Sequence, residues 1–175
     1  RRVGIECCEN LCARATAARY TADMNHGEVT ADIAQGLKTL GKRLGDADVP
    51  SSKLDETLNV ATWNIREFGR RRRLEPSVHY VAEVLGMFDL ISVVELRDNL
   101  EDLKRVLDIL GPYWKVVYSD FNTDAGGNRE RIGYVYDERA VQFTRLAAEA
   151  DPPRKKIKNL DGKFEYLPQI TWWRS

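Results

Sequence analysis

The chain has 175 residues, of which 43% are hydrophobic and 31% charged, and its formal net charge is zero. A chain of this length can bury one hydrophobic core but is too short for two ordinary domains. Since the net charge is zero, any attraction to nucleic acid must come from local patches. No apolar run is long enough for a membrane span, and the first residues lack the apolar stretch of a signal peptide. We therefore expect a soluble protein, with the cytoplasm as the favoured compartment.

The first part of the chain carries all the cysteines. Residues 1–29 show no sustained hydrophobic periodicity and are predicted to form a poorly ordered or loosely helical leader. Cys7, Cys8 and Cys12 are odd in number and lie close together, which disfavours a disulfide framework. They could bind zinc only with a ligand from elsewhere, and His26 is the nearby candidate. Their spacing differs from the paired spacing of zinc sites, which disfavours this possibility too.

The first predicted helix covers residues 31–44. Apolar residues recur there every three or four positions, and basic residues mark the opposite side. The apolar residues are Ile33, Leu37, Leu40 and Leu44, and the basic residues are Lys38, Lys42 and Arg43. The Pro, Ser and Asp content of residues 46–53 indicates a linker. We therefore divide the chain into a leader with one amphipathic helix and a linker, residues 1–53, and a domain, residues 54–175.

Two apolar, β-prone segments, Leu58–Gly69 and Asp89–Asn99, organise this domain. Residues 77–87 between them carry apolar side chains at helical spacing, so the unit is predicted to be a strand, a helix and a strand. A connection of this length implies parallel strands and a right-handed crossover. The carboxyl ends of the two strands then lie at one edge of the sheet. Asn64 and Glu95 are expected to face one shared site there.

The later elements follow from the same signals. Residues 90–94 are apolar except for Ser92, which predicts a central strand covered on both faces. A helix is predicted over residues 99–110, ended by Gly111 and Pro112. Strands over residues 114–119 and 131–136 are predicted to pair antiparallel.

Three further segments complete the predicted domain. Residues 141–146 are predicted to form a strand that continues the meander after residues 131–136. Residues 150–162 contain two prolines and a basic group, which predicts an exposed, mobile loop. Residues 167–173 are predicted to begin another strand.

Asn64 and Glu95 are the candidate metal ligands. One carboxylate and one amide suit Mg²⁺ or Ca²⁺, since these hard cations take oxygen ligands and keep part of their water shell. In the alternative interpretation, Asn64 only turns the chain and Glu95 is a solvated strand end. Four consecutive arginines at residues 70–73 follow the first strand. They are interpreted as a solvated loop, although arginine at that edge could also bind phosphate.

Three segments give the chain a family resemblance. They are WNIREFG at residues 63–69, VELRDN at residues 94–99 and NRERIGYVYD at residues 128–137. Together, in this order and at these intervals, they resemble the endonuclease/exonuclease/phosphatase superfamily, most closely its deoxyribonuclease I branch. The resemblance implies a mixed α/β fold, part of a four-layer α/β sandwich whose mixed sheet is flanked by helices. Residues 54–175 would supply its amino-terminal half, with one sheet face left exposed for the other half.

The resemblance also implies roles for single residues. Asn64 and Glu95 would bind the divalent cation, which is Mg²⁺ with Mn²⁺ or Ca²⁺ as alternatives, and both would be catalytic. Two arginines, Arg66 and Arg97, would lie near the nucleic-acid backbone. The remaining two expected site residues are Glu130, catalytic, and Arg131, substrate-binding, which would orient the strand and its loops beside the substrate.

Some of the family pattern is missing from the sequence. Asn128 and Tyr166 stand where that branch carries a tyrosine and an arginine, so the contacts to substrate must differ. The general-base histidine, the Asp-x-Asn pair and the Ser-Asp-His motif of the family would lie beyond Ser175. Neither His26 nor His79 matches the motif of that histidine. We therefore expect the chain alone to be inactive.

The expected function of the parent protein is divalent-metal-dependent hydrolysis of phosphodiesters, as a nucleic-acid endonuclease with DNA favoured over RNA. A phosphoinositide or sphingomyelin-type phosphoesterase of the same fold is one alternative. A non-catalytic interaction module built on a degenerate copy of the fold is the other.

Overall fold

A computed structural model describes residues 2–3, 24–50, 57–119, 129–149 and 169–174. The predicted leader thus lies largely outside the described residues, as do the loop predicted over residues 150–162 and the cysteine cluster. In the described part of the chain, no helix has the length and hydropathy that crossing a membrane requires.

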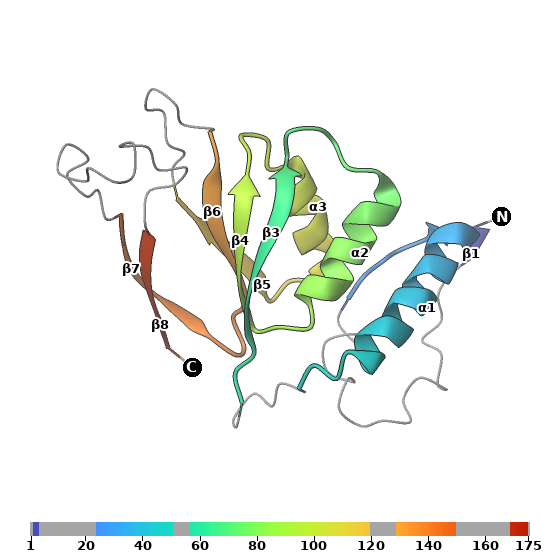
Figure 1. Cartoon of the computed structure of the whole chain (residues 1–175), viewed down its shortest axis with the longest axis horizontal. Helices are drawn as coiled ribbons and strands as arrows, with labels where there is room; N and C mark the ends of the chain where they lie inside the picture. The colour runs from blue at the N-terminus through green and yellow to red at the C-terminus, as the bar shows by residue number, and fades with distance from the viewer. Residues whose placement is uncertain (1, 4–23, 51–56, 120–128, 150–168, 175) are drawn as a thin grey trace, which may run out of the picture.

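A four-stranded mixed sheet forms the centre of the molecule (Figure 1). Its strands lie in the order β3–β4–β6–β5. Their bounds are Val60–Phe68 for β3, Leu90–Leu96 for β4, Trp114–Tyr118 for β5 and Arg131–Asp137 for β6. β3 and β4 are parallel, whereas β6 runs antiparallel to both β4 and β5. The predicted parallel pair, the antiparallel pair and the interior position of residues 90–94 are all confirmed.

Helices α2 (Glu75–Leu85) and α3 (Glu101–Leu110) pack on one face of this sheet (Figure 1). Pro76 lies in the first turn of α2, where its missing N–H costs no hydrogen bond. α3 ends at Gly111, whose φ of 101° is accessible to glycine at little cost. Both helices match the predicted segments, with ends shifted by up to two residues.

The main core lies between these helices and the sheet. A row of cross-strand neighbours, Ala61, Ile91, Val135 and Val116, faces the helices and belongs to this core. The next row on the other face is Thr62, Ser92, Tyr134 and Val117, and all four are half-buried or exposed. On this second face of β4, Leu90 is buried and Ser92 and Val94 are half-buried. In the described part of the chain, β4 is thus covered on the face toward the helices and only partly covered on the other face, so the prediction of cover on both faces is met in part.

The first helix, α1 (Ala31–Asp46), lies beside α2 (Figure 1). It begins at Thr30, whose hydroxyl accepts a hydrogen bond from the Ile33 N–H at 3.4 Å. Ile33 and Leu37 are buried, as predicted, and pack with Tyr80 of α2. The helix runs two residues beyond its predicted end. Short strand β2 (Val29–Thr30) precedes it and pairs antiparallel with β1 (Arg2–Val3).

The strand after β6 leaves the central sheet. Strand β7 (Gln142–Glu149) pairs antiparallel with β8 (Gln169–Arg174) as a separate two-stranded sheet. The prediction that residues 141–146 continue the meander is therefore wrong about pairing, although the strand exists. The backbone N–H groups of Ala140 and Val141 both bond to the carbonyl of Asp137. These two hydrogen bonds form a tight turn between β6 and β7.

Candidate metal-binding site at the sheet edge

The carboxyl ends of β3 and β4 bring Asn64 and Glu95 together. Asn64 pairs in register with Val94, and Glu95 is the next residue along β4. The Asn64 Nδ2 atom donates a hydrogen bond to Glu95 Oε1 at 2.6 Å. The predicted juxtaposition of the two side chains, 31 residues apart in sequence, is therefore present in the structure. In this arrangement Asn64 orients the carboxylate through its nitrogen.

Glu95 is held in its ionised form. Its Oε2 atom accepts a second hydrogen bond, from the backbone N–H of Glu67 at 2.9 Å. The Asn64 hydrogen bond and then the Glu67 N–H lower the pKa of Glu95, and the positive charges of Arg97 and Arg66 act in the same direction. An ionised carboxylate at the sheet edge is a suitable ligand for a hard divalent cation.

The backbone around the pair is irregular. Glu67 and Glu95 have φ angles of 49° and 63°, in the left-handed region that side chains rarely adopt. The pairing register also shifts between Asn64 and Phe68 on β3. It shifts again on the other side of β4, between Val93 and Leu96. Such bulges re-aim side chains at sheet ends, and here they turn Glu95 toward both Asn64 and the Glu67 N–H.

A buried ion pair lies beside this carboxylate. Arg97 contacts Glu130 at 2.6 Å and Glu67 at 3.6 Å through its Nη2 atom. The Glu130 residue is 5% exposed, and its neighbour Arg131 pairs in register with Leu96 at the same end of β4. Arg131 also stacks over the Tyr118 ring, 5.4 Å from its centroid. The structure thus brings Glu130, Arg131 and Arg97 to the edge that carries Glu95.

The arginine-rich loop is partly tied to the protein. Arg70, Arg71 and Arg72 are exposed, as the predicted solvated loop requires, and Arg70 forms an ion pair with Glu67. Arg73 differs, because its backbone N–H donates to Asp102 at 2.7 Å and its side chain donates to the Arg66 carbonyl. Arg66 itself is exposed.

Sequence patterns placed Arg73 in the loop at this edge but did not indicate its contact with Asp102, and they did not indicate Glu67 or Asp102 as part of the edge. Glu67 contributes through a backbone N–H, which any residue except proline possesses. Asp102 is 3% exposed although it lies in the first turn of a helix, where a carboxylate is normally explained by capping alone. The hydrogen bond from the Arg73 N–H to the buried Asp102 carboxylate can be recognised only when the position of α3 against the loop is known.

Among the described residues, no group of three or more His, Cys, Asp or Glu side chains is arranged to hold a metal ion. Both histidines lie elsewhere, bonded to each other near α2. No protein-family model matches the chain, and no curated protein matches it either.

Proposed function

We propose that the chain supplies the cation-binding part of a divalent-metal-dependent phosphodiesterase that acts on nucleic acid. The observation that carries this proposal is the 2.6 Å hydrogen bond between Asn64 and Glu95 across two adjacent parallel strands. It supports a shared polar site at the sheet edge, in accord with the family resemblance of the three segments. The mixed α/β architecture is compatible with part of the endonuclease/exonuclease/phosphatase sandwich, which we propose as the fold.

Glu95 would hold the cation, which is Mg²⁺ in this proposal, and Asn64 would assist it. The lowered pKa of Glu95 keeps the carboxylate charged at neutral pH. A single carboxylate fits Mg²⁺ in particular, because this ion keeps several waters and often shares only one or two carboxylates with substrate phosphate. When bound, Mg²⁺ would offset the negative charge that develops on the phosphate during hydrolysis.

The neighbouring residues would position the substrate. Arg66 is exposed near Glu95 and available to a phosphate oxygen. Arg97 is paired with buried Glu130, so it acts by holding β4 and β6 together at the site and by adding positive charge beside Glu95. Because DNA and RNA backbones share their phosphates, the preference for DNA rests on the family resemblance alone.

Two measurements test the proposal. In the chain itself, Mg²⁺ is titrated while backbone and carboxylate NMR signals are followed, and shifts should centre on Glu95 and Asn64. Glu95→Gln should abolish these shifts. Glu138→Gln is the matched control, because Glu138 is an exposed carboxylate in the turn after β6, at the opposite edge of the sheet.

In the full-length protein that contains these residues, cleavage of plasmid DNA, single-stranded RNA and inositol phosphates is assayed. We expect Glu95→Gln to lower Mg²⁺-dependent cleavage about 100-fold or more, since removal of one electrostatic contributor to the transition state commonly has this effect. Unchanged rates over a range of Mg²⁺ concentrations would refute the assignment of Glu95. Activity confined to inositol phosphates would refute the nucleic-acid substrate.

A further inference from the structure

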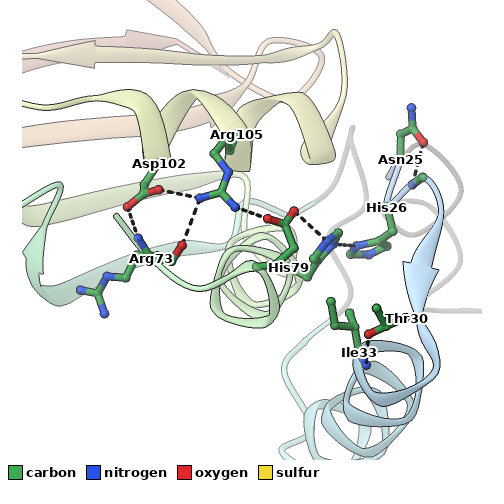
Figure 2. A network of polar contacts seen from close by, with 10 residues as sticks. Asn25, His26, Thr30, Ile33, Arg73, His79, Asp102 and Arg105 are labelled. Atoms are coloured by element: carbon green, nitrogen blue, oxygen red, sulfur yellow. Dashed lines mark hydrogen bonds and ion pairs between the residues drawn. The ribbon is translucent and has the colours of Figure 1, made fainter. Parts of the chain in front are cut away.

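A pair of histidines, which the proposed function does not use, joins the segment before α1 to helix α2. The Nδ1 atoms of His26 and His79 lie 2.8 Å apart, although the residues are 53 positions apart in sequence (Figure 2). The two rings are tilted by 35°. His79 is 4% exposed and the His26 side chain is 13% exposed, so the pair is shielded from solvent.

A carboxylate lies near the Nε2 atom of each ring. His26 Nε2 lies 2.8 Å from Glu83 Oε1, and His79 Nε2 lies 3.6 Å from Glu75 Oε1. A carboxylate facing Nε2 favours the tautomer with its proton on that nitrogen. Without an ion, the 2.8 Å contact between the Nδ1 atoms is a hydrogen bond, for which one ring carries its proton on Nδ1. When both rings carry the proton on Nε2 instead, both Nδ1 lone pairs are available to bind a cation.

Both ligands are fixed by the surrounding protein. His79 is part of α2, one turn after Glu75 and one turn before Glu83. The segment of His26 is held between α2 and α3, because the Asn25 N–H donates to the Ile109 carbonyl at 2.7 Å and Met24 packs on the main core. Two anchored imidazoles can therefore receive an ion without much loss of conformational entropy.

We propose that His26 and His79 form a binding site for a borderline divalent transition-metal ion such as Zn²⁺, held between their Nδ1 atoms. Imidazole nitrogen is a preferred ligand of such ions. Two nitrogens on tetrahedral zinc are about 3.3 Å apart and their lone pairs meet at about 109°, so the Nδ1 atoms have to move apart by about 0.5 Å and the rings have to turn toward the ion. Glu83 and Glu75 lie behind the rings, where carboxylates orient metal-bound histidines. Water that reaches the ion from the side of His26, the more exposed of the two rings, would fill the remaining coordination positions.

Charge around the pair favours a cation. Glu75 and Glu83 each contribute a negative charge close to a ring. Arg105 of α3 is the opposing charge, but it is engaged by Glu75 and by Asp102, the latter at 2.7 Å (Figure 2). Bound metal would fasten the segment before α1 to α2, independently of the site at Glu95.

The test is a calorimetric titration of Zn²⁺ at pH 7.5 into the chain with Cys7, Cys8 and Cys12 changed to serine, so that thiolates contribute nothing. We expect one ion per chain and a higher Tm with Zn²⁺, since a ligand that binds the folded state stabilises it. His26→Ala and His79→Ala should each weaken binding at least tenfold. If His79→Ala does not fold, His26→Ala alone carries this comparison.

Two carboxylate variants distinguish a specific role of Glu83 behind the metal-bound histidine from a general attraction of the cation by negative charge. Glu83→Gln should weaken Zn²⁺ binding about 10- to 100-fold, the usual effect of losing an outer partner. Glu28→Gln removes the same charge from an exposed position two residues after His26 and should leave binding unchanged. ¹⁵N NMR should show Zn²⁺ on the Nδ1 atoms of both rings. The absence of binding, equal binding by His26→Ala, or coordination through Nε2 would overturn the proposal.

Discussion

Replacing Gly69 with alanine tests how the loops after β3 and β4 are held together. Gly69 has a φ of 92°, and a Cβ atom there would overlap the backbone carbonyl oxygen of Asn99. A left-handed conformation costs a non-glycine residue about 1–2 kcal/mol, and overpacking costs about 1–3 kcal/mol. The lower entropy of the unfolded alanine chain offsets about 0.5–1 kcal/mol of this. Together these ranges give a fall in the free energy of unfolding of about 1–4.5 kcal/mol, and we expect a value near the middle, about 2–3 kcal/mol.

Urea unfolding followed by circular dichroism measures this change, and Tm should fall by roughly 5–10 °C. Gly41→Ala is the matched control of opposite sign. Gly41 lies within α1 with open space where its Cβ would be, so alanine should stabilise the helix by up to about 1 kcal/mol. A Gly69→Ala chain as stable as the parent would show that the two loops are not in contact, and the geometry described beside Glu95 would be wrong.

Three more predictions follow from the structure. Arg97→Ala should lower the free energy of unfolding by about 3 kcal/mol, because it removes the ion-pair contact to buried Glu130. Arg66→Ala on the exposed surface should change the free energy of unfolding by less than about 0.5 kcal/mol. Equal effects of the two substitutions in urea unfolding would contradict this prediction. NMR titration in a chelator should give Glu95 a pKa below its ordinary 4.5, with Asn64→Ala raising it. A depressed carboxyl pKa stabilises the fold above pH 4.5, and this contribution disappears as the pH falls through the lower pKa of the folded state. An unshifted pKa of Glu95 would refute this prediction. The half-buried face with Ser92 and Tyr134 should bind a hydrophobic dye or self-associate, and a monomeric cooperative transition without dye binding would argue against an uncovered face.

The local patterns of the sequence were sufficient to predict the helices and strands and one contact of the candidate site, that between Asn64 and Glu95. Apolar periodicity located α1, α2 and α3, because burying one stripe of side chains constrains a helix wherever it packs. The strand–helix–strand order located Asn64 and Glu95, since parallel strands joined by a crossover end at the same sheet edge. The functional role of these two residues still rests on family resemblance and on the experiments above.

Only the tertiary structure decided which polar groups meet across long separations. His26 and His79 occupy a leader and a helix in the sequence, and nothing in either pattern indicates that their Nδ1 atoms lie 2.8 Å apart. The role of Glu67 depends on a backbone N–H and a positive φ, which are set by the bulge and by no side-chain type. β7 pairs with β8 and not with β6, although it follows β6 directly in the chain. Strand propensity indicates that a strand forms, but its partner is selected by the path of the whole chain.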